Sequence, residues 1–169
     1  RSESLGSKIK WNPAIKTKKD KDALWKAIEN DYIDIIASDH APHTNDEKEN
    51  SYFKCPSGGP MVQHTILSLI DGSNNYGVSL EKIVEKISHN PSKIFNISKR
   101  GFVKEGYFAD LVLINLNKST KVTKESLLYK CGWSPFEGIT FSSSIEKTII
   151  KYFNNFCQFF YFIPKNFAH

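Results

Sequence analysis

Cysteine is scarce in this sequence of 169 residues, which contains only Cys55, Cys131 and Cys157. Their number is odd and no Cys-x-x-Cys pair occurs, so we expect neither a disulfide framework nor a cysteine-bound zinc site. The sequence also lacks a signal peptide and any apolar run long enough to cross a membrane. These absences favour a cytoplasmic protein without a membrane partner, because a reducing compartment keeps thiols free.

A compact basic patch is also missing, although the net charge is +5 and the isoelectric point is about 9.0. The lysines are scattered and later alternate with acidic residues, so we do not expect nucleic-acid binding. Apolar residues make up 40% and charged residues 24% of the chain, the composition of an ordinary globular domain. The first residue is Arg1 rather than methionine, and from the polar stretch that follows we expect a chain that begins within a longer protein.

A helix followed by a short strand is predicted near the N-terminus. Apolar residues recur at helical spacing over residues 20–30, with Asp20 as a suitable N-cap. Residues 32–37 are rich in isoleucine and predict a short buried strand that ends at Asp39. A long loop rich in proline, glycine and charge covers residues 40–60, and unstructured loops of this length are usually functional. This order of helix, buried strand and loop is typical of α/β barrels.

Three further helical segments are predicted after the loop. The first covers residues 60–69, with Pro60 in its first turn, and ends before a cluster of turn residues at 71–77. The second begins after a Ser79 cap, and we expect Asn90-Pro91 to break it. A further short helix is predicted beyond the break, over residues 92–95.

Beyond Gly101 the pattern changes to short β-rich runs, and strands are predicted at residues 111–114 and 145–153. The last 17 residues hold seven aromatic side chains and almost no charge, and we expect them to lack defined packing. We therefore divide the chain into part of a barrel (residues 1–100), a small β-sandwich segment (residues 101–152) and an atypical aromatic tail (residues 153–169).

Asp39 is the first candidate functional residue because it lies where a barrel strand would end. Barrel active sites form at the C-terminal ends of strands, and a carboxylate there can bind a metal ion or act as a base. Its alternative role is to cap the turn that follows the strand. His43 could face the same barrel mouth or pack within the loop, and we expect His40 to hydrogen-bond its own loop.

Residues 34–49, which include the run Asp39-His40-Ala41-Pro42-His43, resemble the last barrel strand and following loop of the dihydroorotases. Dihydroorotases are members of the amidohydrolase superfamily, and the resemblance extends over roughly residues 5–150. The remaining matching pieces occur in the same order as in the family, at residues 10–16, 56–60, 89–95, 101–112 and 133–138.

The resemblance implies an α/β fold, namely the C-terminal part of a TIM-type (β/α)8 amidohydrolase barrel followed by a small β domain. It implies a zinc-dependent enzyme that interconverts dihydroorotate and N-carbamoyl-aspartate in pyrimidine biosynthesis. Asp39 matches the aspartate that binds the metal and moves the proton from the attacking hydroxide to the leaving nitrogen. Asn12 and His43 match substrate-contacting positions, and Ser57 and Gly58 match a loop whose backbone meets the pyrimidine ring.

The chain lacks most of the metal ligands that this resemblance requires. None of its five histidines forms the family's His-x-His pair, and the carboxylated lysine is also absent. We expect His64 to be packed or solvated on a helix and His89 to act as a local cap. A catalytic zinc needs about three protein ligands and a full barrel about 250 residues, so we expect this chain to be incomplete and inactive alone.

Three functions remain open at this point. The first is part of a dihydroorotase, and the second is a related cyclic amidohydrolase such as a dihydropyrimidinase or an allantoinase. The second group typically lacks the second histidine of the Asp-His-Ala-Pro-His run, so His43 discriminates between them. The third is a non-catalytic amidohydrolase-like interaction module. For the enzymes we expect a small-molecule substrate as partner, together with a homo-oligomer or a missing N-terminal half.

Overall fold

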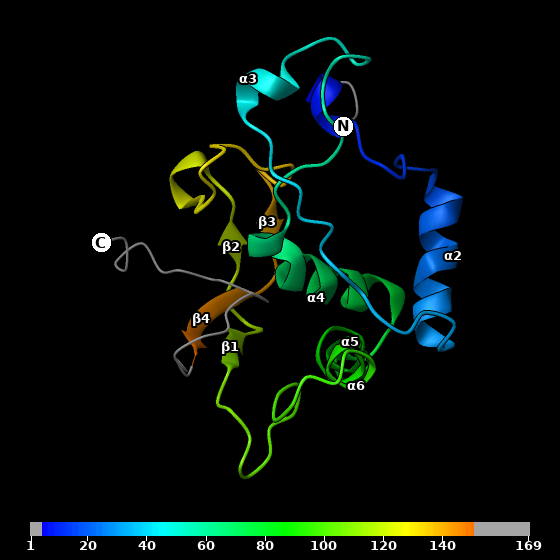
Figure 1. Cartoon of the computed structure of the whole chain (residues 1–169), viewed down its shortest axis with the longest axis vertical. Coiled ribbons are helices and arrows are strands. Elements are labelled where there is room, and N and C mark those ends of the chain that lie inside the picture. The colour runs from blue at the N-terminus through cyan, green and yellow to red at the C-terminus, as the bar shows by residue number, and fades with distance from the viewer. Residues whose placement is uncertain (1–4, 151–169) are drawn as a thin grey trace.

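The computed structural model describes residues 5–150 of the chain. Most helices precede Phe95 and the strands begin at Leu111, which gives an α/β arrangement around the central helix α4, Thr65–Tyr76 (Figure 1). The end of the strand predicted over 145–153 and the predicted tail at 153–169 lie outside the described residues. Four short helical turns complete the helical part: η1 (Gly6–Ile9), α3 (Asn45–Lys48), η2 (Val62–His64) and η4 (Lys124–Ser126).

The first long helix, α2 (Lys18–Glu29), begins before the predicted residue. Its N-cap is Thr17, whose hydroxyl accepts from the Asp20 N–H, while the Asp20 carboxylate accepts from the Thr17 N–H at 2.9 Å. The prediction that Asp20 is the N-cap was therefore wrong. Asp20 occupies the third helical position of a capping box, where its charge also meets the positive end of the helix.

Residues 32–37 do not form the strand that their composition predicted. The Ile36 N–H donates to the carbonyl of Lys86 at 3.1 Å, and Lys86 belongs to a helical segment. A strand needs a neighbouring strand to complete its backbone hydrogen bonds. Within residues 5–150 this stretch has a helix carbonyl for a partner instead, and the first bridge comes only at His40, opposite Gly59.

Helix α4 continues through the turn that was predicted at residues 71–77 and ends at Gly77, where φ is 71°. Gly72 lies within the helix directly against Trp25, and a Cβ atom on Gly72 would come within 2.0 Å of the indole ring. Packing of α4 on α2 therefore overrides the turn preference of this polar stretch.

Three short helical segments follow without interruption: α5 (Leu80–Val84), the π-helical turn η3 (Glu85–His89) and α6 (Asn90–Ile94). Ser79 caps α5 as predicted, its side chain accepting from the Lys82 N–H at 3.2 Å. The predicted break at Asn90-Pro91 was wrong. The wide turn satisfies the Asn90 N–H through the Glu85 carbonyl, and Pro91 falls in the first turn of α6, where a missing N–H costs little.

The strands form two small antiparallel sheets. Strand β1 (Leu111–Asn115) pairs with β4 (Ser144–Ile149), with an irregularity after Leu113. Strand β2 (Thr120–Lys121) pairs with β3 (Thr140–Phe141). The prediction of a strand at 111–114 is confirmed, and β4 confirms the described part of the later strand.

Two buried apolar clusters share helix α4. The two clusters lie on different sides of α4. Leu69 belongs to the first and Leu67 to the second, and residues two apart on a helix point in roughly opposite directions. The first cluster joins α4 to α2 and α5 and contains Trp25, Ile28, Leu69, Val78 and Ile83. The second joins α4 to the strands and contains Leu67, Val122 and Phe141.

Candidate functional site

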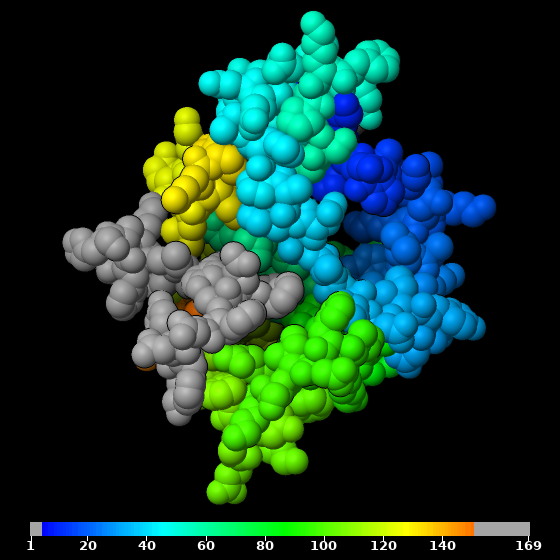
Figure 2. Space-filling view, viewed as in Figure 1, coloured from blue at the N-terminus to red at the C-terminus, as the bar shows by residue number. Residues whose placement is uncertain are grey.

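The loop between Asp39 and Pro60 closes on itself at its two ends. His40 and Gly59 form a parallel bridge, and the Ala41 N–H donates to the Gly59 carbonyl at 3.1 Å. In the space-filling view, the light-blue and cyan start of this loop runs across the face between α2 and the yellow segment around η4 (Figure 2). The closure places both ends of a long loop beside Asp39.

Asp39 has an exposed side chain and a left-handed backbone, with φ at 48°. Aspartate is one of the few residues apart from glycine that tolerates this conformation. Within the described part of the chain its carboxylate has no hydrogen-bond partner, so its alternative role as a cap of its own turn finds no support. The carboxylate is available to bind a ligand.

His43 is half-buried and contacts the far end of the loop. Its Nε2 lies 3.1 Å from the Ser57 carbonyl, which can only accept, so Nε2 donates. Its own carbonyl accepts from the Trp133 indole N–H at 2.8 Å, and its Nδ1 lies 3.8 Å from Glu47. The fold thus brings the predicted residues His43 and Ser57 into direct contact.

Gly58 is a position that only glycine can fill. Its φ is 105°, and an added Cβ would lie 2.7 Å from the Ala41 side chain. The Gly58 N–H donates to the Lys10 carbonyl at 2.9 Å. The close approach that we expected at this glycine is made to Ala41 and to the Lys10 segment.

Asn12 is exposed and follows Lys10 by two residues, so the bond from Gly58 to Lys10 ties its segment to the loop. The Asn12-Pro13 peptide bond is cis. Four of the predicted residues, Asn12, His43, Ser57 and Gly58, therefore belong to one connected piece of structure. Asp39 is joined to it through the bridge of its neighbour His40.

Two lysines that the sequence analysis did not single out hold this piece together. Lys48 is fully buried, and its ammonium donates to the carbonyls of Lys10, Pro56 and Gly58. Lys10 donates to the carbonyls of Tyr52 and Cys55, both at 2.8 Å. Lys48 lies inside the stretch that resembles dihydroorotases, but a buried lysine cannot be recognised from sequence patterns, because lysine is almost always solvated.

Two further histidines have structural roles. His40 accepts from the N–H groups of Met61 and Val62 at 3.0 and 3.3 Å through Nδ1, so its ring bonds the backbone directly after its loop and not the loop itself. His64 is 3% exposed and lies among aromatic rings, which confirms the packed alternative. Burial lowers the pKa of His40 and lowers the pKa of His64 to about 4, so both rings are neutral near pH 7.

His89 was expected to act as a local cap, and this prediction was wrong. Its side chain makes no capping hydrogen bond to α6. Its ring stacks on Phe102 with centroids 4.3 Å apart and planes within 4° of each other. The expectation failed because the ring finds an aromatic partner from the loop after α6, which the local sequence does not reveal.

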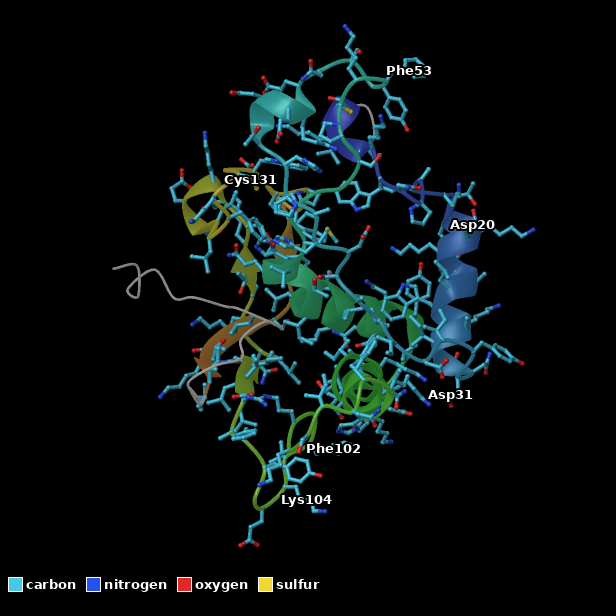
Figure 3. All side chains as sticks on the ribbon, viewed as in Figure 1. Asp20, Asp31, Phe53, Phe102, Lys104 and Cys131 are labelled. Atoms are coloured by element: carbon cyan, nitrogen blue, oxygen red, sulfur yellow. The ribbon has the colours of Figure 1, made fainter. Side chains whose placement is uncertain are left out.

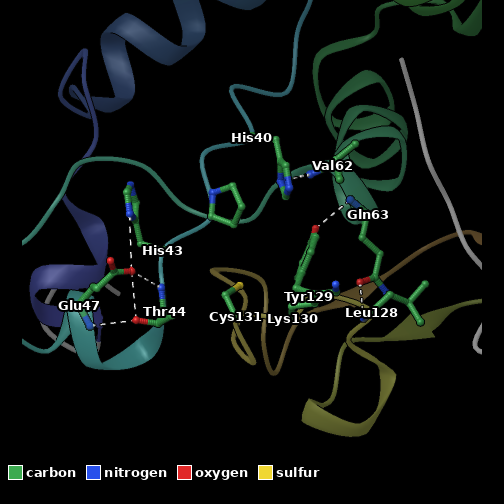
Figure 4. Close-up of a pocket in the computed structure, with 11 residues that line it drawn as sticks. His40, His43, Thr44, Glu47, Val62, Gln63, Leu128, Tyr129, Lys130 and Cys131 are labelled. Carbon is green, nitrogen blue, oxygen red and sulfur yellow. Dashed lines mark hydrogen bonds and ion pairs between the residues drawn. The ribbon is translucent and has the colours of Figure 1, made fainter. Parts of the chain in front are cut away.

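A cleft of about 480 Å³ lies between the start of the loop and the segment after η4 (Figure 4). Cys131, which belongs to the segment after η4, lies near η4 in the side-chain view (Figure 3). Of the five predicted site residues, His43 lines the cleft, whereas Asp39, Asn12, Ser57 and Gly58 do not. The cleft is lined by His40, Pro42, His43, Thr44, Glu47, Val62, Gln63, Leu128, Tyr129, Lys130 and Cys131.

The described residues do not form a zinc site. Among residues 5–150 no group of three histidine, cysteine, aspartate or glutamate side chains could hold a metal ion. Asp39 offers one carboxylate, whereas a catalytic zinc needs about three protein ligands. The donor set of this part of the chain therefore does not fit a zinc ion by itself.

Comparison with known proteins identifies the class of protein. Residues 10–151 match the family described as the amidohydrolase family, and the chain belongs to this family. Within residues 5–150, no helix is both long and apolar enough to cross a membrane.

The most informative relatives in sequence are dihydroorotases. The chain is 36% identical to the dihydroorotase of Pyrococcus furiosus over 143 residues, which cover 85% of this chain and 33% of that protein. It is 38% identical to the dihydroorotase of Endomicrobium trichonymphae over 150 residues, which cover 88% of this chain and 35% of that protein. The chain thus spans about a third of the length of the curated relatives it matches.

Similar solved structures include hydantoinases. The L-hydantoinase (dihydropyrimidinase) of Arthrobacter aurescens matches with a TM-score of 0.78 and 28% identity, over 88% of this chain and 34% of that one. The D-hydantoinase (dihydropyrimidinase) of a Thermus species matches with a TM-score of 0.79 and 19% identity, over 85% of this chain and 32% of that one. These matches show that the described fold occurs as a third of larger amidohydrolases.

Proposed function

We propose that this chain forms part of a dihydroorotase that opens the ring of dihydroorotate to N-carbamoyl-aspartate and closes it again in pyrimidine biosynthesis. The observation that carries the proposal is 36% identity to a dihydroorotase over 85% of the chain, a region that includes the Asp39–His43 run. The connected piece of structure around Asn12, His43, Ser57 and Gly58 supports it. We further propose that residues 1–100 belong to a TIM-type barrel and residues 101–152 to a small β domain.

Asp39 is proposed as the residue that moves the proton. Its exposed carboxylate, which has no partner among residues 5–150, can take a proton from an attacking water and return it to the leaving ring nitrogen. Asn12 and His43 would contact the carboxylate and polar edge of the substrate. The backbone of Ser57 and Gly58 would lie against the ring, where a missing side chain allows close approach.

Zinc dependence is part of the proposal, although the described residues do not hold the ion alone. Asp39 would supply one carboxylate, and the other ligands would come from outside residues 5–150. When bound, such an ion makes its water acidic and polarises the amide carbonyl. We likewise propose a cytoplasmic enzyme that assembles with further polypeptide, either as a homo-oligomer or with an N-terminal half.

A second candidate is a hydantoinase or dihydropyrimidinase, which the similarity to solved hydantoinase structures favours. Two observations favour dihydroorotase over it. The sequence identity to dihydroorotases is higher, and His43 is present and in contact with Ser57. The two candidates differ in their substrates, because dihydroorotate carries a ring carboxylate that dihydrouracil and hydantoin lack.

A chimeric enzyme tests the proposal directly. Residues 10–150 would replace the matching third of the Pyrococcus furiosus dihydroorotase, and turnover of dihydroorotate, dihydrouracil and hydantoin would be measured. We expect turnover of dihydroorotate alone. The control is a chimera with the matching third of the Endomicrobium trichonymphae dihydroorotase, which shows that the host tolerates the exchange.

Two results would contradict the proposal. Turnover of dihydrouracil or hydantoin without dihydroorotate would favour the second candidate. A folded chimera without any turnover, beside an active control chimera, would favour the third function, a non-catalytic amidohydrolase-like module.

A further inference from the structure

Lys48 is a buried cation without an acidic partner among residues 5–150. Its side chain is 0% exposed, and its ammonium makes three hydrogen bonds, all to backbone carbonyls. The distances are 3.2 Å to Lys10, 2.8 Å to Pro56 and 3.0 Å to Gly58. Its fourth contact is the face of the Trp11 ring, with Nζ 5.7 Å from the centroid.

This environment suits the ammonium group of a lysine better than the guanidinium group of an arginine. Lysine carries three donors on one nitrogen at the end of a flexible stem, whereas arginine presents a flat fork. A buried charge is tolerated only when hydrogen bonds replace its water, so the three carbonyls must stay together around the nitrogen. Burial lowers the pKa of Lys48 from its ordinary value, as expected for an ammonium group without a carboxylate beside it.

The three carbonyls come from the two segments that carry the candidate substrate contacts. Lys10 precedes Asn12, while Pro56 and Gly58 flank Ser57. Lys48 itself lies in α3, whose Thr44–Glu47 capping box begins directly after His43. One nitrogen atom therefore connects the segment of Asn12, the loop at Ser57 and the helix that follows His43.

We propose that Lys48 is a positioning residue, whose ammonium sets the spacing between the Asn12 segment and the backbone of Ser57 and Gly58. The importance of that spacing for substrate binding rests on the proposed function. Lys48 is shut off from solvent, so it acts through these neighbours and touches no substrate. Without the ammonium, the Pro56 and Gly58 carbonyls would lose this donor and the Lys10 carbonyl would keep only the Gly58 N–H, so the two segments would be held together less firmly.

The test compares K48M with K54M in the full 169-residue chain by NMR. Lys54 is an exposed lysine of the same loop, so K54M controls for the loss of a positive charge there. In K48M we expect hydrogen exchange of the Gly58 and Ala41 amides to accelerate about tenfold or more, because each bonds across the joined segments. The ring signals of His43 should shift, while those of His64 and the amides of the β1–β4 ladder stay unchanged.

K54M should match the wild type at all of these positions. If K48M also matches the wild type at Gly58, Ala41 and His43, the proposal is wrong. If K48M fails to fold, the proposal is tested instead on the ¹⁵N-labelled wild type, by measuring how fast the ammonium protons of Lys48 exchange with water. We expect its protons to exchange about tenfold more slowly than those of Lys54, and equally fast exchange would overturn the proposal.

These measurements use no substrate. An inactive chimera would therefore leave the role of Lys48 in the architecture standing, and a negative NMR result would leave the proposed reaction standing. The two failures can be told apart.

Discussion

Asp39 and His43 divide the chemistry of the proposed site between them. In the chimeric enzyme, Asp39→Ala removes the only group proposed to move the proton, so kcat should fall by about 10³-fold or more. His43→Ala should mainly raise KM, because it removes a substrate contact and the bond that holds Ser57. Steady-state kinetics with dihydroorotate measures both.

Asp46→Ala is the control for these variants, since Asp46 is an exposed aspartate of the same loop. It should leave kcat and KM near those of the unsubstituted chimera. A D39A variant that retains its turnover would contradict the proton-transfer role, and an H43A variant with unchanged KM would contradict the substrate contact.

His64 links stability to pH. Burial lowers its folded pKa to about 4, so between pH 4 and 6.5 the unfolded chain binds more protons than the folded chain. Stability should therefore fall as the pH drops from 6.5 towards 4, by up to about 3 kcal/mol from this group. Chemical denaturation at several pH values measures the slope.

His64→Phe provides the comparison, because phenylalanine fits the aromatic surroundings and cannot be protonated. The slope between pH 6.5 and 4 should become shallower, with a residual contribution from His40, whose lowered pKa acts in the same direction. An identical slope in both proteins would show that His64 does not cause the loss of stability.

At the scale of elements, the contact between α2 and α4 depends on Gly72. Gly72→Ala places a methyl group within 2.0 Å of the Trp25 ring, so the helices must shift. Overpacking of this kind costs about 1–3 kcal/mol, against the roughly 1 kcal/mol that alanine gains over glycine in a helix. We expect a net loss in the free energy of unfolding, measured by urea denaturation.

Asn74→Ala is the matched control on the exposed side of α4. It should change the free energy of unfolding by no more than about 0.5 kcal/mol, or raise it slightly. If G72A is as stable as the wild type, the close packing of Trp25 on this helix does not limit stability.

The elements also show which structure local sequence encodes. The cap at Ser79 and the strand at 111–114 were predicted correctly because each depends on a short pattern of neighbouring residues. The prediction of a strand at 32–37 was wrong, because a strand requires a neighbouring strand and the Ile36 N–H instead donates to the carbonyl of Lys86. The chain stays helical at Pro91 because a π-helical turn precedes it, and the local sequence does not reveal that turn.

At the scale of the whole molecule, one carboxylate cannot hold a catalytic zinc. We expect the purified 169-residue chain, after incubation with zinc and dialysis, to retain well below one ion per chain. It should also show no ring opening of dihydroorotate. Elemental analysis and an absorbance assay check these points, and stoichiometric zinc together with turnover would contradict the expectation.

The surface of the molecule bears on the choice between an enzyme part and an independent module. Large apolar side chains around α2 are exposed, at 60% for Ile15, 56% for Leu24 and 83% for Tyr32. An independent soluble module would be expected to bury such residues or keep them few. Their exposure favours the proposal that further polypeptide packs against this part of the chain.

The sequence by itself determined the family, the cap at Ser79 and the strand at 111–114, and it suggested the site residues from Asn12 to Gly58 that are proposed above. These follow from short patterns in which each residue acts through its close neighbours in the chain. Only the tertiary structure decided that Lys48 binds the carbonyls of Lys10 and Gly58, that His43 contacts Ser57, and that Gly72 admits Trp25. Those contacts join residues that are not neighbours in the chain, and they form only where tertiary packing brings the partners together and shields the buried polar groups from water.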